Sequence, residues 1–257
     1  MTRKTFQYRS PSEAPSTLKN QPFYGLNLDE EQQAFRDAIY DKEKLIVLCN
    51  SKAGTGKSTI ALGTANLLVQ YGFYNGIVYI VSPTMEQKQG FLPGSVEEKT
   101  APYIEPLIDA MNTLGIPDSV LVSDNNMLGL KNGTSYIQFI AHTYLRGCNY
   151  ENKVIIVEES QNYYFDELKK VLTRIHDNCK TIVIGHTEQC DLVKKSEKSG
   201  FKVYLTTIFT FNTFYQSSFF YYFWYFLTFF AFWTCCQIKI FSTCSRIRTF
   251  YIYTIQH

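Results

Sequence analysis

The residues with the clearest chemistry lie between positions 49 and 62, in the stretch CNSKAGTGKSTIAL. A phosphate-binding loop usually reads Gly, four residues, Gly-Lys and then Ser or Thr. Gly56, Lys57 and Ser58 match this pattern, but Ser51 stands where the first glycine is expected. The main-chain N–H groups of such a loop surround phosphates, the lysine reaches the β- and γ-phosphates, and the hydroxyl binds Mg²⁺. We therefore expect the loop to bind a nucleotide.

Ser51 is the position that could prevent the loop from binding a nucleotide. Gly54 and Gly56 let the backbone approach a phosphate and adopt dihedrals that a side chain would forbid. A serine at a left-handed position costs about 1 kcal/mol, which is too little to abolish binding. The alternative is a glycine-rich turn with a chance Lys-Ser pair. The predicted nucleotide-binding residues are Ser51, Lys52, Ala53, Gly54, Thr55, Gly56, Lys57, Ser58 and Thr59.

Hydrolysis of a nucleotide also needs a carboxylate at a strand end. The stretch VIIVEESQN, residues 154–162, supplies Glu158 and Glu159 after an apolar run. We expect Glu158 to hold Mg²⁺ together with Ser58, and Glu159 to orient or deprotonate the attacking water. The alternative for this pair is two solvated acids at the end of a strand.

Alternating strands and helices are predicted to position these residues. Short apolar runs typical of buried parallel strands lie at 44–50, 76–83, 153–160 and 180–185. Helical spacing follows in four segments: 26–40, capped by Asn27 or Asp29, the segment from the loop to Gly72, 102–115, and 166–175. Asn132–Gly133 predicts a hairpin turn. The alternation predicts an α/β fold with a mostly parallel sheet flanked by helices, and a ligand at the carboxyl ends of its strands.

Composition adds weaker constraints. The net charge is +2, but residues 202–257 hold four basic residues and no acidic one, which leaves 21 basic and 23 acidic residues in 1–201. Overall charge therefore neither indicates nor excludes a nucleic-acid partner. The seven cysteines are scattered without a C-x-x-C pair. This pattern predicts reduced thiols, a cytoplasmic location and no zinc site.

Both ends of the chain differ from the middle. Residues 1–25 are rich in Ser, Pro and basic residues and predict a disordered leader. Residues 203–238 carry no charge, and 202–257 lack Gly, Pro, Asp and Glu. We interpret 202–257 as a non-native, frame-shifted or read-through end. A membrane segment at 219–238 and a buried core segment are the alternatives. The predicted organisation is leader 1–25, ATPase domain 26–201 and aromatic tail 202–257.

Five stretches between residues 26 and 201 occur in the order seen in PhoH-like ATPases: KAGTGKST, QGFLPGSVEEKTAPYIEPLIDA, YLRGCNY, VIIVEESQNYYFDELKKVLTRI and IVIGHTEQCDL. The chain thus resembles that family, and through it the first RecA-type domain of superfamily 1 helicases. The resemblance implies a RecA-like P-loop NTPase that binds and hydrolyses ATP with Mg²⁺. It also implies coupling to single-stranded RNA or DNA and a ring-shaped homo-oligomer.

The resemblance also assigns roles to single residues. Gln32 would read adenine, Arg174 would reach the γ-phosphate from a neighbouring subunit, and Gln189 would sense the γ-phosphate. Together with Lys57 and Glu159, Arg174 and Gln189 complete the expected catalytic set. Arg146–Gly147 would lie near a nucleic-acid or subunit face. The alternatives are a solvated helix glutamine for Gln32 and surface salt bridges for the two arginines.

Three positions depart from the family pattern. Ser51 replaces Gly, Glu158 replaces Asp, and His186 replaces the Asp that follows Gly185. These changes leave open a nucleotide-binding module without turnover, and the tail leaves open a membrane-tethered ATPase. A nucleotide kinase is disfavoured by the Gln-Asn pair after the two acids and by the stretch GHTEQ.

Overall fold

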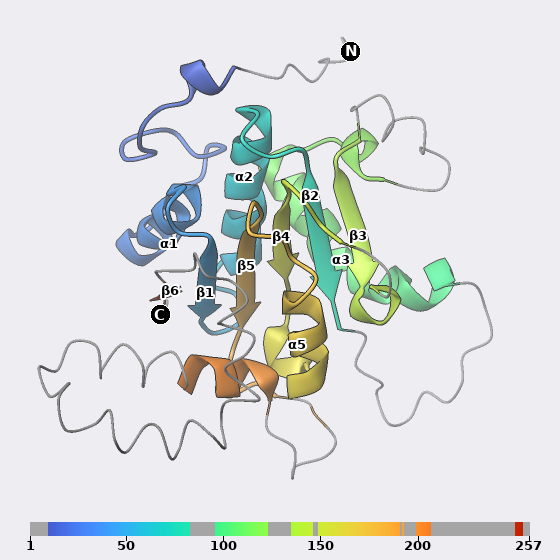
Figure 1. The fold of residues 1–257 in the computed structure, drawn as a ribbon. Coiled ribbons are helices and arrows are strands. Elements are labelled where there is room, and N and C mark those ends of the chain that lie inside the picture. Colours follow the sequence, from blue (N-terminus) through green and yellow to red (C-terminus); the bar gives the residue numbers. More distant parts are fainter. Residues whose placement is uncertain are drawn as a thin grey trace, which may run out of the picture.

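A parallel sheet forms the centre of the molecule (Figure 1). The computed structural model describes residues 10–82, 96–122, 135–145, 149–190, 192, 199–206 and 250–253. The strands are β1 Ile46–Asn50, β2 Ile77–Val81, β3 Ile137–Ala141, β4 Val154–Val157, β5 Lys180–Gly185 and β6 Phe250–Tyr253. They form a six-stranded sheet in the order β3-β2-β4-β5-β1-β6, and every pair is parallel. This confirms the predicted α/β, RecA-like P-loop fold.

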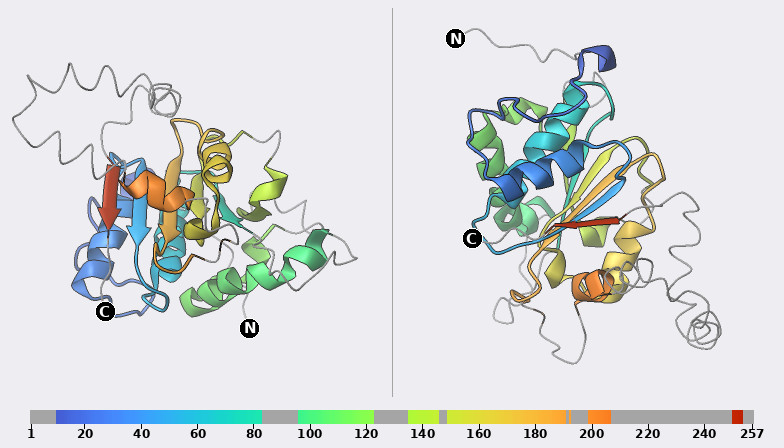
Figure 2. Two further views of the ribbon diagram at one scale, coloured as in Figure 1. Left: turned by 90° about the horizontal axis from the view of Figure 1, so that it is seen from below. Right: turned by 90° about the vertical axis from the view of Figure 1, so that its left-hand side faces the viewer.

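Helices cover both faces of the sheet. The α-helices are α1 Glu30–Tyr40, α2 Lys57–Gln70, α3 Val96–Leu114 and α5 Phe165–Leu172, with a further helix at 200–206. Short 3-10 turns are η1 Pro11–Glu13, η2 Asp118–Val120, η4 His142–Tyr144 and η5 Ser160–Asn162. The helices α1, α2 and α3 lie on one face of the sheet, whereas α5 and the helix at 200–206 lie on the other (Figure 2). The sheet is therefore the middle of three layers.

The strands divide their side chains between two hydrophobic clusters. Along β4, Val154 and Ile156 belong to the cluster under α1, α2 and α3, whereas Ile155 and Val157 belong to the cluster under α5. This alternation follows from the two-residue repeat of a strand. Because both faces are covered, the strands read in the sequence as continuous apolar runs.

The start of α1 is fixed by its own sequence. The Asp29 carboxylate accepts a 2.8 Å hydrogen bond from the main-chain N–H of Gln32, and the Gln32 side chain accepts one of 3.1 Å from the N–H of Asp29. This reciprocal capping box satisfies two N–H groups that lack helical partners. Asp29, one of the two predicted caps, begins the helix.

The region around the predicted hairpin is described only in part. Asn132–Gly133 lies outside the described residues. The run that follows it forms β3, which pairs in parallel with β2 at one end of the sheet. Helix α3 begins at Val96, ahead of the predicted start at 102.

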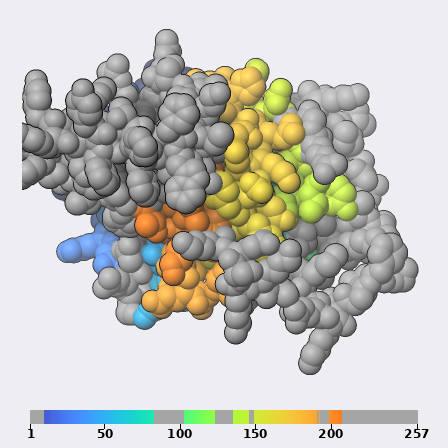
Figure 3. Space-filling model, turned by 60° about the horizontal axis from the view of Figure 1, so that its bottom comes forward, coloured from blue at the N-terminus to red at the C-terminus, as the bar shows by residue number. Residues whose placement is uncertain are grey.

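The two ends of the chain differ in part from the predicted disordered leader and the predicted domain boundary at residue 201. Residues 10–25 were expected to belong to a disordered leader, but Leu18 and Phe23 are buried in the cluster under α1 and α2, and the Tyr40 hydroxyl donates to the carbonyl of Pro15. The expected boundary at 201 falls within the helix at 200–206, which lies beside α5 (orange and yellow in Figure 3). Strand β6 lies beside β1 (Figure 2). Every helix in the described ranges is too short or too polar to cross a membrane.

Candidate nucleotide-binding site

The loop between β1 and α2 lies at the carboxyl edge of the sheet. Gly54 and Gly56 have positive φ angles of 80° and 75°, in the left-handed region that glycine tolerates best. Ser51 is not among the described non-glycine residues with positive φ. Its main-chain N–H donates a 3.1 Å hydrogen bond to the carbonyl of Gly185, which continues the pairing of β1 with β5. The serine therefore causes no left-handed strain.

Side chains inside the loop hold its shape. The Thr55 hydroxyl donates to the carbonyl of Lys52 at 3.0 Å, so the Ser51 hydroxyl, 3.0 Å away, donates to that of Thr55. The amino group of Lys57 also donates to the carbonyl of Lys52, at 3.2 Å. Lys57 is buried and reaches across the loop. The loop thus brings together main-chain N–H groups and a cation, the combination that binds phosphate.

Gln32 contacts this loop directly. Its side-chain amide donates a 3.0 Å hydrogen bond to the carbonyl of Thr55. The alternative of a solvated glutamine on the helix surface is therefore wrong for Gln32. Its proposed part in reading adenine remains a prediction.

Ser58 and Glu158 meet at the start of α2. The Ser58 hydroxyl donates a 2.8 Å hydrogen bond to Oε1 of Glu158, and the Tyr79 hydroxyl donates one of 3.0 Å to Oε2. Glu158 is buried. Burial raises the pKa of Glu158 to about 7, with Glu159 adding to the rise, while Ser58, Lys57 and Tyr79 oppose it. A carboxylate and a hydroxyl beside a phosphate loop are ligands suited to Mg²⁺.

The Ser58 hydroxyl and the Glu158 carboxylate fit Mg²⁺, the metal that the resemblance to PhoH-like ATPases implies. Among the described residues, no group of three or more His, Cys, Asp or Glu side chains could hold a metal ion. Mg²⁺ at phosphate sites is bound by one or two protein groups together with phosphates and water, so it does not need such a cluster. Ser58 and Glu158 supply that smaller set.

Glu159 has an unusual backbone. Its φ of 49° and ψ of 41° lie in the left-handed region, which is uncommon for a residue with a side chain. Its side chain is exposed and accepts a hydrogen bond from the amide of Gln161. Such strain persists only where the surrounding structure enforces it, and it is frequent at functional sites.

The turn that follows β4 is tied to the end of β5. The Gln161 side chain accepts a 2.9 Å hydrogen bond from the main-chain N–H of His186, and the Ser160 hydroxyl donates one of 2.7 Å to the carbonyl of Ile184. A Cβ atom at Gly185 would lie 2.5 Å from Oγ of Ser160 and 2.8 Å from Oε1 of Gln161. The close approach of the two turns therefore requires glycine at 185.

Sequence reasoning missed three residues of this arrangement. Tyr79 lies within an apolar strand, and only its hydroxyl could have suggested a polar role. Gln161 was noted as part of the Gln-Asn pair but received no role. Asn50, the last residue of β1, accepts a 3.0 Å hydrogen bond from the main-chain N–H of Thr187. Its position at a strand end beside the loop was the available signal.

The remaining predicted residues are less closely connected to the loop. Gln189 is exposed in the turn after β5, where its main-chain N–H donates to the carbonyl of His186. Arg174 lies between α5 and β5, and its carbonyl accepts from the N–H of Tyr150, ahead of β4. That segment leads to the amino ends of β4 and β5, away from the loop after β1. The part of Arg174 in reaching a γ-phosphate remains a prediction. Arg146–Gly147 lies outside the described residues.

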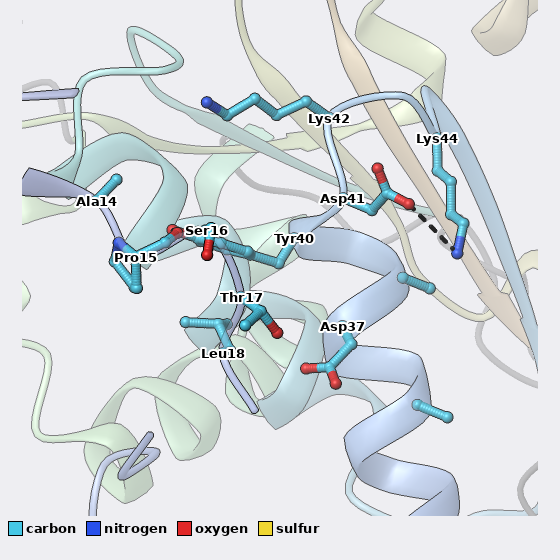
Figure 4. A pocket seen from close by; sticks show the side chains of 12 residues that line it. Ala14, Pro15, Ser16, Thr17, Leu18, Asp37, Tyr40, Asp41, Lys42 and Lys44 are labelled. Carbon is cyan, nitrogen blue, oxygen red and sulfur yellow. Dashed lines mark hydrogen bonds and ion pairs between the residues drawn. The ribbon is translucent and has the colours of Figure 1, made fainter. Parts of the chain in front are cut away.

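A cavity elsewhere on the domain lies between the segment 14–18 and the second half of α1 (Figure 4). Its charged side chains are Asp37, Asp41, Lys42 and Lys44, and Asp41 is paired with Lys44 at 3.5 Å. None of the predicted nucleotide-binding residues lines it. The chemistry of the loop and the two acids therefore belongs to the carboxyl edge and not to this cavity.

Comparison with known proteins identifies related sequences. The model of the PhoH-like protein family matches residues 27–219. The protein PhoH2 of Bacillus subtilis strain 168 is 31% identical over 178 residues, which covers 65% of this chain and 38% of that protein. The protein PhoH of Escherichia coli K12 is 30% identical over 167 residues, covering 64% and 44% respectively. A PhoH-like protein of Synechocystis is 34% identical over 167 residues, covering 63% and 47%. The chain spans less than half the length of each of these relatives.

Proposed function

Because the chain belongs to the PhoH-like protein family, we propose that it binds ATP with Mg²⁺, hydrolyses it, and couples turnover to a single-stranded nucleic acid. The observation that carries the proposal is the contact between Ser58 and Glu158 beside the glycine-rich loop. It brings a hydroxyl and a carboxylate from distant parts of the chain together, and this supports a Mg²⁺ site beside the terminal phosphates of a nucleotide.

Each residue of the site has a role in this proposal. The N–H groups of residues 52–58 and the amino group of Lys57 bind the phosphates. Gln32, held against Thr55, contacts the adenine. Ser58 and Glu158 hold Mg²⁺, which when bound neutralises charge that develops on the phosphates.

Glu159 orients the attacking water and takes up its proton. Gln161 holds the Glu159 carboxylate on one side and the turn after β5 on the other. That turn carries Gln189, so a change at the γ-phosphate would be transmitted to Glu159 through a single side chain. Arg174 would complete the site only from a neighbouring copy in a homo-oligomer.

Binding and turnover are tested separately. Calorimetry of the full chain with Mg-ATP, beside the variant Lys57→Ala, measures binding. Loss of about 10-fold or more in affinity is expected, because a charge-assisted contact to phosphate is removed. Equal affinity of the two proteins would contradict the assignment of the loop.

A phosphate-release assay then measures turnover. Glu159→Gln should bind Mg-ATP but lose turnover by roughly 100-fold, the scale of positioned acid-base catalysis. Binding without any phosphate release in the unmodified chain would instead indicate a nucleotide-binding module without turnover. Stimulation of release by single-stranded RNA or DNA at low salt tests the coupling.

A further inference from the structure

The Glu158 carboxylate is held by a residue that has no part in the proposed function so far, Tyr79. Tyr79 is the central residue of β2, and its register partner on β4 is Ile156. Glu158 follows Ile156 by two residues, so its side chain lies on the same face of the sheet as that of Tyr79. The Tyr79 hydroxyl reaches across the two strands and donates a 3.0 Å hydrogen bond to Oε2 of Glu158. The contact therefore depends on the pairing of β2 with β4.

The ring of Tyr79 has little freedom to move. Its side chain is fully buried, and the ring is stacked on that of Phe139 in β3, with 6.5 Å between the centroids and 23° between the planes. Burial, together with the neighbouring Glu158 carboxylate, raises the pKa of Tyr79 well above its usual range. The hydroxyl therefore keeps its proton and remains a hydrogen-bond donor at a fixed place.

The other oxygen of the carboxylate, Oε1, accepts the 2.8 Å hydrogen bond from Ser58 at the start of α2. The main chain of Glu158 is fixed as well, because its N–H donates a 2.9 Å hydrogen bond to the carbonyl of Ile80. Ser58 and Tyr79 thus hold different oxygens of one side chain. The carboxylate cannot turn both oxygens towards Ser58 without losing the buried hydrogen bond to Tyr79, and such a loss is costly in the interior.

The number of carboxylate oxygens offered to a metal distinguishes two common divalent cations. Mg²⁺ requires near-ideal octahedral geometry, and at phosphate sites it takes few protein ligands besides water and phosphate oxygens. Ca²⁺ takes about six to eight oxygens in a more flexible arrangement, and it often binds both oxygens of one carboxylate. A glutamate that can rotate therefore suits Ca²⁺, whereas one that is held to a single free oxygen suits Mg²⁺.

We propose that Tyr79 determines the metal specificity of the ATP site. By holding Oε2, it limits Glu158 to one metal-binding oxygen and thereby favours Mg²⁺ over Ca²⁺. The inference rests on the proposed function, because it concerns the metal that is bound together with ATP. Tyr79 acts through Glu158 and is a positioning residue.

The test measures the ATP affinity of the full chain by calorimetry in Mg²⁺, in Ca²⁺ and in EDTA, with and without the change Tyr79→Phe. The ratio of the affinity in Mg²⁺ to that in Ca²⁺ should fall by about fivefold or more, because the buried hydrogen bond that restrains the carboxylate is lost. The affinity in EDTA should stay within about twofold, because the phosphate loop is unchanged.

Tyr74→Phe is the matched control. Tyr74 is also buried, and it lies ahead of β2, at the amino end of that strand. Loss of its hydroxyl should leave the ratio of the two affinities unchanged. Phenylalanine at position 79 keeps an aromatic ring against Phe139, and thermal unfolding of each variant without nucleotide verifies that it is folded.

Two results would overturn the inference, and they can be told apart. If ATP binding depends on the metal in the unmodified chain but Tyr79→Phe leaves the ratio unchanged, the hydroxyl does not select the metal and the proposed function stands. This holds whether both affinities stay the same or fall equally. If ATP binding does not depend on the metal in the unmodified chain, the Mg²⁺ part of the proposed function is wrong, and the role of Tyr79 is wrong with it.

Discussion

The hydroxyl of Ser58 donates a 2.8 Å hydrogen bond to the buried carboxylate of Glu158, a residue 100 positions further along the chain. The contact joins the start of α2 to the end of β4. Tyr79 holds the other oxygen of the same carboxylate at 3.0 Å. Glu158 is therefore fixed on both sides, although it is one methylene longer than the aspartate that the family pattern has at this position.

Glu158→Gln should reduce the dependence of ATP binding on Mg²⁺. The amide keeps the size of the side chain but removes the negative charge that holds the metal. We expect the affinity for Mg-ATP to fall roughly 10- to 100-fold, the range for loss of one group that supports a metal. Calorimetry in Mg²⁺ and in EDTA measures the difference. Glu158→Asp keeps the charge and should recover most of the loss, so an equal Mg²⁺ effect in all three proteins would contradict the role.

Ser51→Gly should not improve ATP binding, although it restores the usual loop sequence. Ser51 is free of left-handed strain, and its hydroxyl bonds to that of Thr55. The variant loses that buried bond and gains freedom in the unfolded chain, which should lower the free energy of unfolding by about 1–2 kcal/mol. Urea unfolding and ATP titration measure the two effects. A tighter complex with ATP would show that the serine does obstruct the loop.

Gln161→Leu should lower turnover more than it lowers ATP affinity. The variant removes the side chain that joins Glu159 to the main chain of His186 and leaves the phosphate loop intact. Misplacement of a catalytic group costs roughly 10- to 100-fold in rate, whereas Mg-ATP affinity should stay within about threefold. Glu188→Gln is the control, because Glu188 is exposed in the same turn. Equal losses of rate in both variants would exclude a specific role for Gln161.

Gly63→Val should destabilise the domain. A Cβ atom at Gly63 would lie 2.8 Å from Cζ of Phe23 and 3.0 Å from Cδ2 of Leu114. Overpacking of a core costs about 1–3 kcal/mol, which exceeds the few tenths of a kcal/mol that valine gains over glycine in a helix. Urea unfolding gives the change in the free energy of unfolding. The control is Gln70→Val, at the half-buried end of the same helix. Equal changes in the free energy of unfolding for the two variants would show that Phe23 and Leu114 move to accommodate the valine.

Lys180→Met should change the pH dependence of stability. Burial lowers the pKa of Lys180 to about 7, with Asp41 opposing the shift, and its amino group donates to the carbonyl of Asp41 at 2.6 Å. Between pH 7 and 9 the unfolded chain keeps the proton that the folded chain has lost. The free energy of unfolding should therefore rise with pH across this window.

The methionine variant lacks the titrating group, so its free energy of unfolding should rise less steeply from pH 7 to pH 9. Chemical unfolding of both proteins at several pH values measures the two slopes. Subtracting one from the other removes the contributions of groups that the two proteins share, such as Cys49, whose pKa burial raises to about 12. Identical slopes would show that Lys180 remains protonated in the folded protein.

The sequence by itself determined the features that depend on near neighbours in the chain. The spacing of Gly56, Lys57 and Ser58 predicted the loop, Asp29 predicted the start of α1, and continuous apolar runs predicted strands buried on both faces. Each follows from local backbone preference or from a periodic pattern, which a short window of sequence contains. The order of its motifs also identified the family.

Tertiary structure decided which of these segments meet. The order of the strands places β4 and β5 between β2 and β1, and this brings Gln161 to the main chain of His186 and Tyr79 to Glu158. The sequence also could not predict that Tyr144 is exposed and Lys180 is buried, because tyrosine and lysine side chains occur both at the surface and in the interior of proteins. Such contacts depend on how distant segments pack, and local sequence constrains that packing only weakly.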